Sequence, residues 1–122
     1  MDSLYQQVGG DQFFADLVER FYEGVVGDPV LRPLYPTDLT SSKAHLAAFL
    51  VQYWGGPATY SEQRGHPRLR MRHAPFVIGQ FERDAWMRHM SSAVRAADLP
   101  TEIEQALLDY FEMAATSLVN AG

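Results

Sequence analysis

Residues 53–76 of this chain read YWGGPATYSEQRGHPRLRMRHAPF, a stretch interrupted by three prolines and three glycines. Between Gly55 and Gly79 there is little room for a long helix, because proline and glycine break helices. Irregular connections longer than about 12–15 residues are uncommon in compact domains, and those that persist are often functional. We therefore expect this stretch to surround something other than its own side chains, and the functional site is sought here.

The segment RLRMRHAP (68–75) fits a strand or a short helix. As a strand it would have no partner strand to pair with, and an isolated strand is unstable. As a helix it would start at Pro67, a residue suited to a first helical position, and stop before Pro75. Leu69 and His73 would then share one face. We predict a helix of about two turns here, preceded by a polar loop over 57–66.

Apolar residues recur at helical spacing in four other stretches: 13–26, 46–53, 81–97 and 103–119. Clean strand alternation and the Asn-Gly or Asp-Gly hairpin signal are both missing. The expected architecture is all-α, a single domain over residues 1–122 with four substantial helices. Phe81 is expected on the inward face of the third stretch.

Helix ends are predicted from capping residues. Asp11 is a candidate cap for the first helix, which Gly27 would end, and Ser41 or Ser42 is a candidate for the second. Pro100 separates the last two helices, and the run from Thr101 to Glu104 has the form of a capping box.

Composition excludes several classes of function. The chain has 122 residues, no cysteine and a formal net charge of −5. Disulfides, thiolate nucleophiles, zinc ribbons and iron–sulfur clusters all need cysteine. An acidic chain is a poor general nucleic-acid binder. No signal peptide and no apolar run of membrane-spanning length is present, so we expect a cytoplasmic protein without a membrane span.

These residues alone leave two hypotheses open. His73 beside an apolar residue and flanking arginines could meet an apolar ligand with anionic groups at its edge. A lone histidine is not a metal signature, however, and arginines are commonly a solvated face. The alternative is a cofactor-free all-α interaction module that docks an acidic partner through its arginines. Tyrosine and tryptophan at helical spacing, such as Tyr22 and Trp86, are most often core residues.

The stretch 53–76 resembles the central segment of the group II truncated haemoglobins, the O-type bacterial globins. The resemblance covers essentially the whole chain and extends to VGGDQFFADLVERFY (8–22), VLRPLYP (30–36), ERDAWMRHM (82–90) and LLDYFEMAATSLVN (107–120). It implies a shortened globin fold, in which two helix pairs cross around a haem b group.

The resemblance also implies roles on the proximal side of the haem. His73 matches the histidine that binds the iron through one imidazole nitrogen, while the other nitrogen donates to a carbonyl or carboxylate. Leu69 and Phe76 match the apolar wall under the porphyrin. Arg72 matches a residue that pairs with a haem propionate. In the adjoining loop, the residues expected near the propionates are Tyr60 and His66.

On the distal side, the resemblance assigns Tyr22, Tyr35 and Trp86 to a polar cage around a gaseous ligand. Leu46 and Ser42 match positions of the distal helix that face the iron, and Ser42 stands where relatives often carry alanine. His45 falls near a position that is often arginine in relatives, where it would contact a propionate.

The implied function is reversible binding of dioxygen, carbon monoxide and nitric oxide. Hydrogen bonds to dioxygen from Tyr22, Tyr35 or Trp86 would slow its release. Sensing, oxidation of nitric oxide or peroxide-driven redox chemistry would suit such a site better than oxygen transport. Turnover would need a separate reductase, because this chain has no flavin or nicotinamide domain. We expect a monomer or homodimer.

Overall fold

The computed structural model describes residues 2–121, and within them every regular element is a helix. This confirms the all-α prediction. Over the same residues, no helix has the length and apolar character needed to cross a bilayer. The elements are α1 (Leu4–Val8), α2 (Asp11–Val26), the 3₁₀ turn η1 (Arg32–Leu34), α3 (Thr40–Tyr53), α4 (Thr59–Arg64), α5 (Leu69–His73), α6 (Gln80–Arg95) and α7 (Thr101–Ser117).

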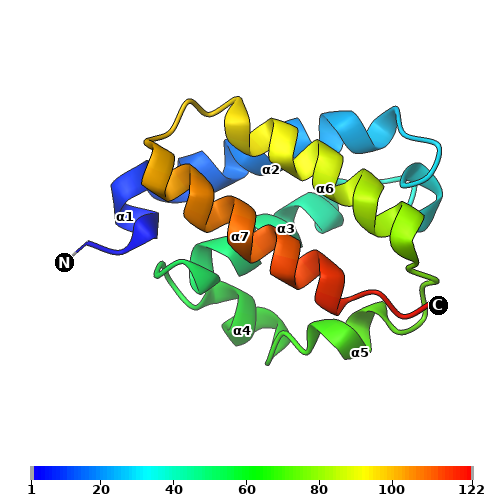
Figure 1. Cartoon of the computed structure of the whole chain (residues 1–122). Helices are drawn as coiled ribbons and strands as arrows, with labels where there is room; N and C mark the ends of the chain where they lie inside the picture. Colours follow the sequence, from blue (N-terminus) through cyan, green and yellow to red (C-terminus); the bar gives the residue numbers. More distant parts are fainter. Residues whose placement is uncertain (1, 122) are drawn as a thin grey trace.

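Four long helices make up the body of the molecule (Figure 1). Helix α2 packs against both α3 and α6, and α6 packs against α7. Figure 1 shows the two short helices, α4 and α5, along one edge of this body, below α3 and α7 in the view. The chain therefore folds as two long-helix pairs, α2–α3 and α6–α7, with the irregular middle segment at their border.

The core lies where α2, α6 and α7 meet. Its largest fully buried side chains include Phe14, Phe21, Met90, Leu107 and Phe111. Burying one such side chain stabilises a protein by roughly 1.5–3 kcal/mol. The helical periodicity of the sequence predicted most of this core, but three residues expected on apolar faces are exposed: Val26 (57 %), Tyr53 (49 %) and Phe81 (83 %). All three lie at a helix end, as the last residue of α2, the last residue of α3 and the second residue of α6.

The predicted helix caps were wrong at three starts. Asp11 is the first residue of α2, and its carboxylate accepts a hydrogen bond from the Tyr5 hydroxyl at 2.8 Å. Ser41 and Ser42 lie inside α3, which begins at Thr40. Thr101 is the first residue of α7, because the carbonyl of Pro100 already accepts the N–H groups of Ile103 and Glu104.

The middle segment is more helical than predicted. The expected loop over 57–66 contains α4, which two hydrogen bonds between Gln52 and Ser61 tie to α3. Such a helix depends on tertiary contacts, so it leaves little periodic signal in the sequence. Helix α5 begins at Leu69, after Pro67, because Arg68 takes a left-handed conformation (φ 44°) that no helix can include.

Candidate cofactor site

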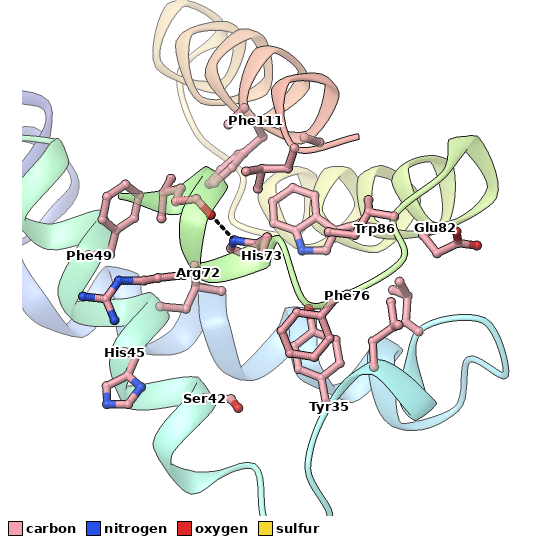
Figure 2. A pocket seen from close by; sticks show the side chains of 18 of the residues that line it. Tyr35, Ser42, His45, Phe49, Arg72, His73, Phe76, Glu82, Trp86 and Phe111 are labelled. Carbon is pink, nitrogen blue, oxygen red and sulfur yellow. Dashed lines mark hydrogen bonds between the residues drawn. The ribbon is translucent and has the colours of Figure 1, made fainter. Parts of the chain in front are cut away.

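A cavity of about 400 Å³ lies between the helix pairs and the short helix α5. Volumes of this order hold drug-sized ligands and cofactors. Apart from His66, every residue that the sequence analysis assigned to the site lines it: Tyr22, Tyr35, Ser42, Leu46, Tyr60, Leu69, Arg72, His73, Phe76 and Trp86. Figure 2 shows His73 from α5 and Trp86 from α6 on one side, with Ser42 and His45 from α3 across from them.

The histidine of α5 is held in one orientation. His73 Nδ1 lies 2.7 Å from the backbone oxygen of Leu69, one turn earlier in the same helix (Figure 2). A carbonyl oxygen only accepts, so Nδ1 carries the proton. The neutral imidazole then presents an unprotonated Nε2, and the side chain lines the cavity. This is the arrangement of a metal-binding imidazole whose second nitrogen is fixed by a carbonyl.

Arg72 clamps the connection between α4 and α5. Its Nε donates to the carbonyl of Pro67 at 2.6 Å, and its Nη2 donates to the carbonyl of Arg64 at 2.9 Å. The guanidinium group also lies over the Tyr60 ring, 5.7 Å from its centroid. The side chain is half-buried and still lines the cavity. Arg72 therefore has a structural task that the sequence did not reveal.

Tyr60 and His66 have different surroundings. Tyr60 is buried and packs edge-on against Phe49, and the guanidinium groups of Arg64 and Arg72 lie over its ring. His66 is exposed and does not line the cavity. Its Nδ1 accepts the N–H of Arg68 at 3.1 Å, which stabilises the turn before α5. The structure therefore brings Tyr60 to the site and leaves His66 outside it.

A second basic pair stands at the cavity. Arg64 Nη1 lies 3.0 Å from His45 Nε2, and both residues line the cavity. Arginine only donates, so His45 accepts. Burial lowers the pKa of His45, and the charges of Arg64 and Arg72 lower it further. The sequence analysis missed Arg64; its only signal was the run of arginines in 64–72 without an acidic residue.

Tyr22, Tyr35 and Trp86 form another part of the cavity wall. The rings of Tyr22 and Tyr35 meet edge-on at 5.4 Å, and Trp86 packs between Phe21 and Phe111. Burial raises the pKa of Tyr35 to about 12, although hydrogen bonds from Trp86 and Tyr22 favour its ionised form. Burial also raises the pKa of Tyr22, as does its neighbour Tyr35. Both phenols therefore keep their protons at neutral pH.

Several other residues line the cavity, although the sequence indicates only helix or core positions for them. Phe49, Tyr110 and Phe111 add to the apolar wall, while Glu82 and Arg83 line the end of the cavity near the start of α6. Glu82 accepts the N–H of Gly79 at 2.8 Å, and Arg83 pairs with Asp84 at 3.2 Å. Their spacing in the sequence carries no signal beyond that of an amphipathic helix.

The lining fits an iron porphyrin. Leu46, Leu69 and Phe76 offer apolar surface that suits a flat macrocycle, and His73 could supply one iron ligand. Arginines at the cavity suit the two carboxylates of a porphyrin. Among residues 2–121 no three His, Asp or Glu side chains form a metal-binding group. A porphyrin supplies four ligands itself, so a single histidine is sufficient.

Comparison with known proteins gives concordant matches. A family model of bacterial-like globins matches residues 3–120. Group 2 truncated hemoglobin YjbI of Bacillus subtilis is 41 % identical over 111 residues, which cover 91 % of this chain and 84 % of that protein. The crystal structure of a thermostable haemoglobin from Thermobifida fusca is 54 % identical, covers 98 % of both chains and superposes with a TM-score of 0.95.

A third match carries a functional description. The crystal structure described as truncated oxygen-avid haemoglobin from Bacillus subtilis is 39 % identical and has a TM-score of 0.92. The alignment covers 98 % of this chain and 100 % of that one.

Proposed function

The chain belongs to the bacterial-like globins, within the group II truncated haemoglobins, and from this premise we propose that its cavity holds haem b through His73. Family membership makes it a haem-binding globin that binds oxygen. We further propose that residues 1–122 form one globin domain and that the residues named below act in it. When bound, haem iron supplies reversible binding of dioxygen, carbon monoxide and nitric oxide.

The hydrogen bond between His73 Nδ1 and the Leu69 carbonyl carries this proposal. It fixes the tautomer, so that Nε2 has a lone pair available for a metal. Leu69 and Phe76 give the apolar contact below the macrocycle, and Tyr60 supports that wall. Arg72 has Nη1 left over after its backbone contacts and can direct it to a propionate. An ion pair that is partly exposed to solvent contributes about 1 kcal/mol or less.

The distal wall can stabilise a small ligand that gains negative charge. The Trp86 indole N–H only donates, and the Tyr35 hydroxyl stays protonated because its pKa is raised to about 12. Tyr22 contacts Tyr35 edge-on and orients it. Hydrogen bonds to a charged partner contribute about 1.5–3 kcal/mol each, and 1.4 kcal/mol corresponds to a factor of about ten in affinity. Ser42 and Leu46, on the α3 side, limit the room for the ligand.

Slow ligand release favours redox chemistry or sensing over oxygen transport. We include oxidation of nitric oxide and peroxide-driven oxidation in the proposal. Either activity would require a separate reductase, with the protein acting as a monomer or homodimer in the cytoplasm. The description of the Bacillus subtilis relative as oxygen-avid supports slow release.

Replacing the proposed iron ligand tests the assignment. His73→Gly should abolish the ordinary ferrous absorption spectrum and most haem retention, and added imidazole should restore part of both because it fits the vacated volume. His66→Gly, a histidine outside the cavity, is the matched control and should keep the wild-type spectrum. A wild-type spectrum in His73→Gly would assign the ligand to His45, the other histidine that lines the cavity.

A further inference from the structure

Two of the polar side chains of the distal wall, Tyr35 and Trp86, come from elements that are far apart in the sequence. Tyr35 follows the short turn η1, and Trp86 lies on α6. A hydrogen-bond donor helps a small ligand only when it is placed correctly, and an error of about 1 Å can cost a hundredfold in rate. One buried carboxylate, Asp28, lies between these two elements.

Asp28 is 6 % exposed, and both of its carboxylate oxygens have partners. Oδ1 accepts the backbone N–H groups of Val30 at 2.8 Å and Leu31 at 3.2 Å. Oδ2 lies 2.6 Å from His89 Nε2 and 3.1 Å from Arg88 Nη2. One oxygen therefore holds the segment that leads to η1, and the other holds α6.

On the η1 side, the contacts continue to Tyr35. The backbone oxygen of Asp28 accepts the N–H of Arg32 at 2.9 Å. The Arg32 guanidinium then donates to three successive carbonyls, those of Tyr35 at 3.4 Å, Pro36 at 3.0 Å and Thr37 at 2.9 Å. The position of the Tyr35 backbone is thus tied to Asp28 through a single intervening residue.

On the α6 side, the contacts lead to Trp86. His89 follows Trp86 by three residues, so the two side chains are neighbours on the surface of one helix. The His89 ring packs directly on Gly24 of α2, where a Cβ atom would lie 2.3 Å from His89 Nδ1. Only glycine leaves room for this ring. His89 is 23 % exposed, whereas Arg88 is 65 % exposed, so His89 is the firmer anchor.

We propose that Asp28, paired with His89, is a positioning residue that sets the placement of Tyr35 relative to Trp86 in the distal wall. The proposal rests on the proposed function for the roles of those two side chains. Asp28 does not line the cavity and acts only through its neighbours. Its carboxylate joins the two elements because Oδ1 accepts from the backbone that leads to η1 and Oδ2 contacts His89 of α6.

The test uses two variants that break this junction from opposite sides, Asp28→Asn and His89→Gln. Asparagine keeps an acceptor for the backbone of Val30 and loses the ionic contact with His89. Asp16→Asn is the matched control, since Asp16 is an exposed carboxylate on α2 that accepts one hydrogen bond from Gln12. The change in charge is the same, but the junction is untouched.

The first readout is the position of the Trp86 indole. The chain has two tryptophans, so a ¹⁵N-labelled, carbon monoxide-bound protein gives two indole N–H signals. Loss of one signal in Trp86→Phe assigns them. Both junction variants should shift the Trp86 signal and leave that of Trp54 in place, whereas Asp16→Asn should move neither. An unmoved Trp86 signal in both junction variants, with lower thermal stability as the only effect, overturns the proposal.

The second readout is a double-mutant cycle on dioxygen release, measured by stopped flow. Asp28→Asn should speed release about tenfold in the wild-type background and less than about twofold in Tyr35→Phe, because coupled residues are not additive. Equal acceleration in both backgrounds overturns the proposal. If the Trp86 signal moves while Tyr35→Phe and Trp86→Phe themselves release dioxygen at the wild-type rate, positioning by Asp28 stands and the proposed function fails.

Discussion

At the scale of single residues, the orientation of His73 depends on a bond inside its own helix. The acceptor is the carbonyl of Leu69, the first residue of α5, which lies four residues before His73. This bond within one helix selects the tautomer in which Nδ1 carries the proton. A neighbouring carboxylate would fix the same tautomer through a stronger, charge-assisted hydrogen bond. The acceptor used here is a backbone carbonyl, which carries no formal charge.

The proposed role of Trp86 as a donor to the bound ligand gives a prediction at this scale. Trp86→Phe keeps an aromatic ring and removes the indole N–H. Dioxygen should dissociate about tenfold to a hundredfold faster, as expected for the loss of a hydrogen bond to a charged partner. Carbon monoxide should respond less, because it gains little negative charge on binding. Stopped-flow dissociation of both gases from wild type and variant provides the comparison.

Two outcomes would contradict this prediction. Equal acceleration of both gases would show that Trp86 acts by bulk. Unchanged dioxygen release would remove Trp86 from the ligand site. Tyr22→Phe is expected to have a smaller effect than Trp86→Phe, because Tyr22 lies against Tyr35 and acts through it.

Asp28 gives a prediction about acid stability. The hydrogen bond from His89, together with those from Val30, Leu31 and Arg88, lowers the pKa of Asp28 to about 2, against the opposing effect of burial. An unfolded chain binds this proton below about pH 4. The ionised Asp28 therefore contributes its full stabilisation to the folded protein above about pH 4, and this contribution is lost as the pH falls through about 2.

Urea unfolding of wild type and Asp28→Asn between pH 6 and pH 2 tests this sign. The wild type should be the more stable protein at pH 6, and the difference in free energy of unfolding should shrink toward pH 2. A difference that does not change over this range would show that the carboxylate is no more stabilised in the folded protein than in the unfolded chain.

The sequence predicted the roles of some residues and missed those of others. His73, Arg72 and the distal aromatic residues were assigned through their resemblance to a family, since spacing alone favoured core or surface roles. All of these residues line one cavity. Asp28 and His89 left no trace in the sequence, because 61 positions separate the two partners of their bond. A pair of this kind is defined only by the folded chain.

At the scale of elements, α5 is too short to be stable alone. A helix of five residues cannot offset the cost of its first turn. Arg72 holds its start through the carbonyls of Pro67 and Arg64. Asn120 holds its end, donating to the carbonyls of His73 at 3.3 Å and Phe76 at 2.9 Å. The helix that carries the proposed iron ligand is thus fixed from both sides by the rest of the chain.

This arrangement predicts that Arg72→Lys behaves like Arg72→Ala. Lysine has the charge but not the planar group that reaches two carbonyls at once. Both variants should lose haem about twofold to tenfold faster, as expected for one or two lost hydrogen bonds. Transfer of haem to an excess of acceptor apoglobin measures the rate. Arg70→Lys is the matched control, as an exposed arginine of the same helix.

The lysine variant separates two roles of this side chain. A wild-type rate in Arg72→Lys together with faster loss in Arg72→Ala would show that the charge facing a propionate matters and the backbone clamp does not. Wild-type rates in both would remove Arg72 from haem retention.

Elements were predictable in proportion to their length. The long helices α2, α6 and α7 show a sustained apolar period, and their positions agreed with the prediction. Helix α4 was missed because its exposed residues follow no period and its stability comes from Gln52 of α3. The start of α2 was wrong because Tyr5 binds the Asp11 carboxylate, and the start of α7 was wrong because the Pro100 carbonyl already accepts the first N–H groups.

At the scale of the whole molecule, the cavity occupies space that a protein of this size would otherwise fill with side chains. Phe49, Tyr110 and Phe111 line its wall, and Phe76 is 42 % exposed, so a macrocycle would cover apolar surface there. A ligand that binds only the folded state stabilises it in proportion to the logarithm of its excess over the dissociation constant. Haem should therefore act as part of the fold as well as its reactive centre.

The most direct test is a haem titration of the purified, haem-free chain, followed by absorption and by thermal unfolding of the same samples. We predict a haem absorption band that saturates at about one haem per chain, with an unfolding temperature that rises until the same equivalence point. A colourless protein that is fully folded, takes up no haem and unfolds at an unchanged temperature would contradict the proposed haem site at His73 and favour a cofactor-free interaction module.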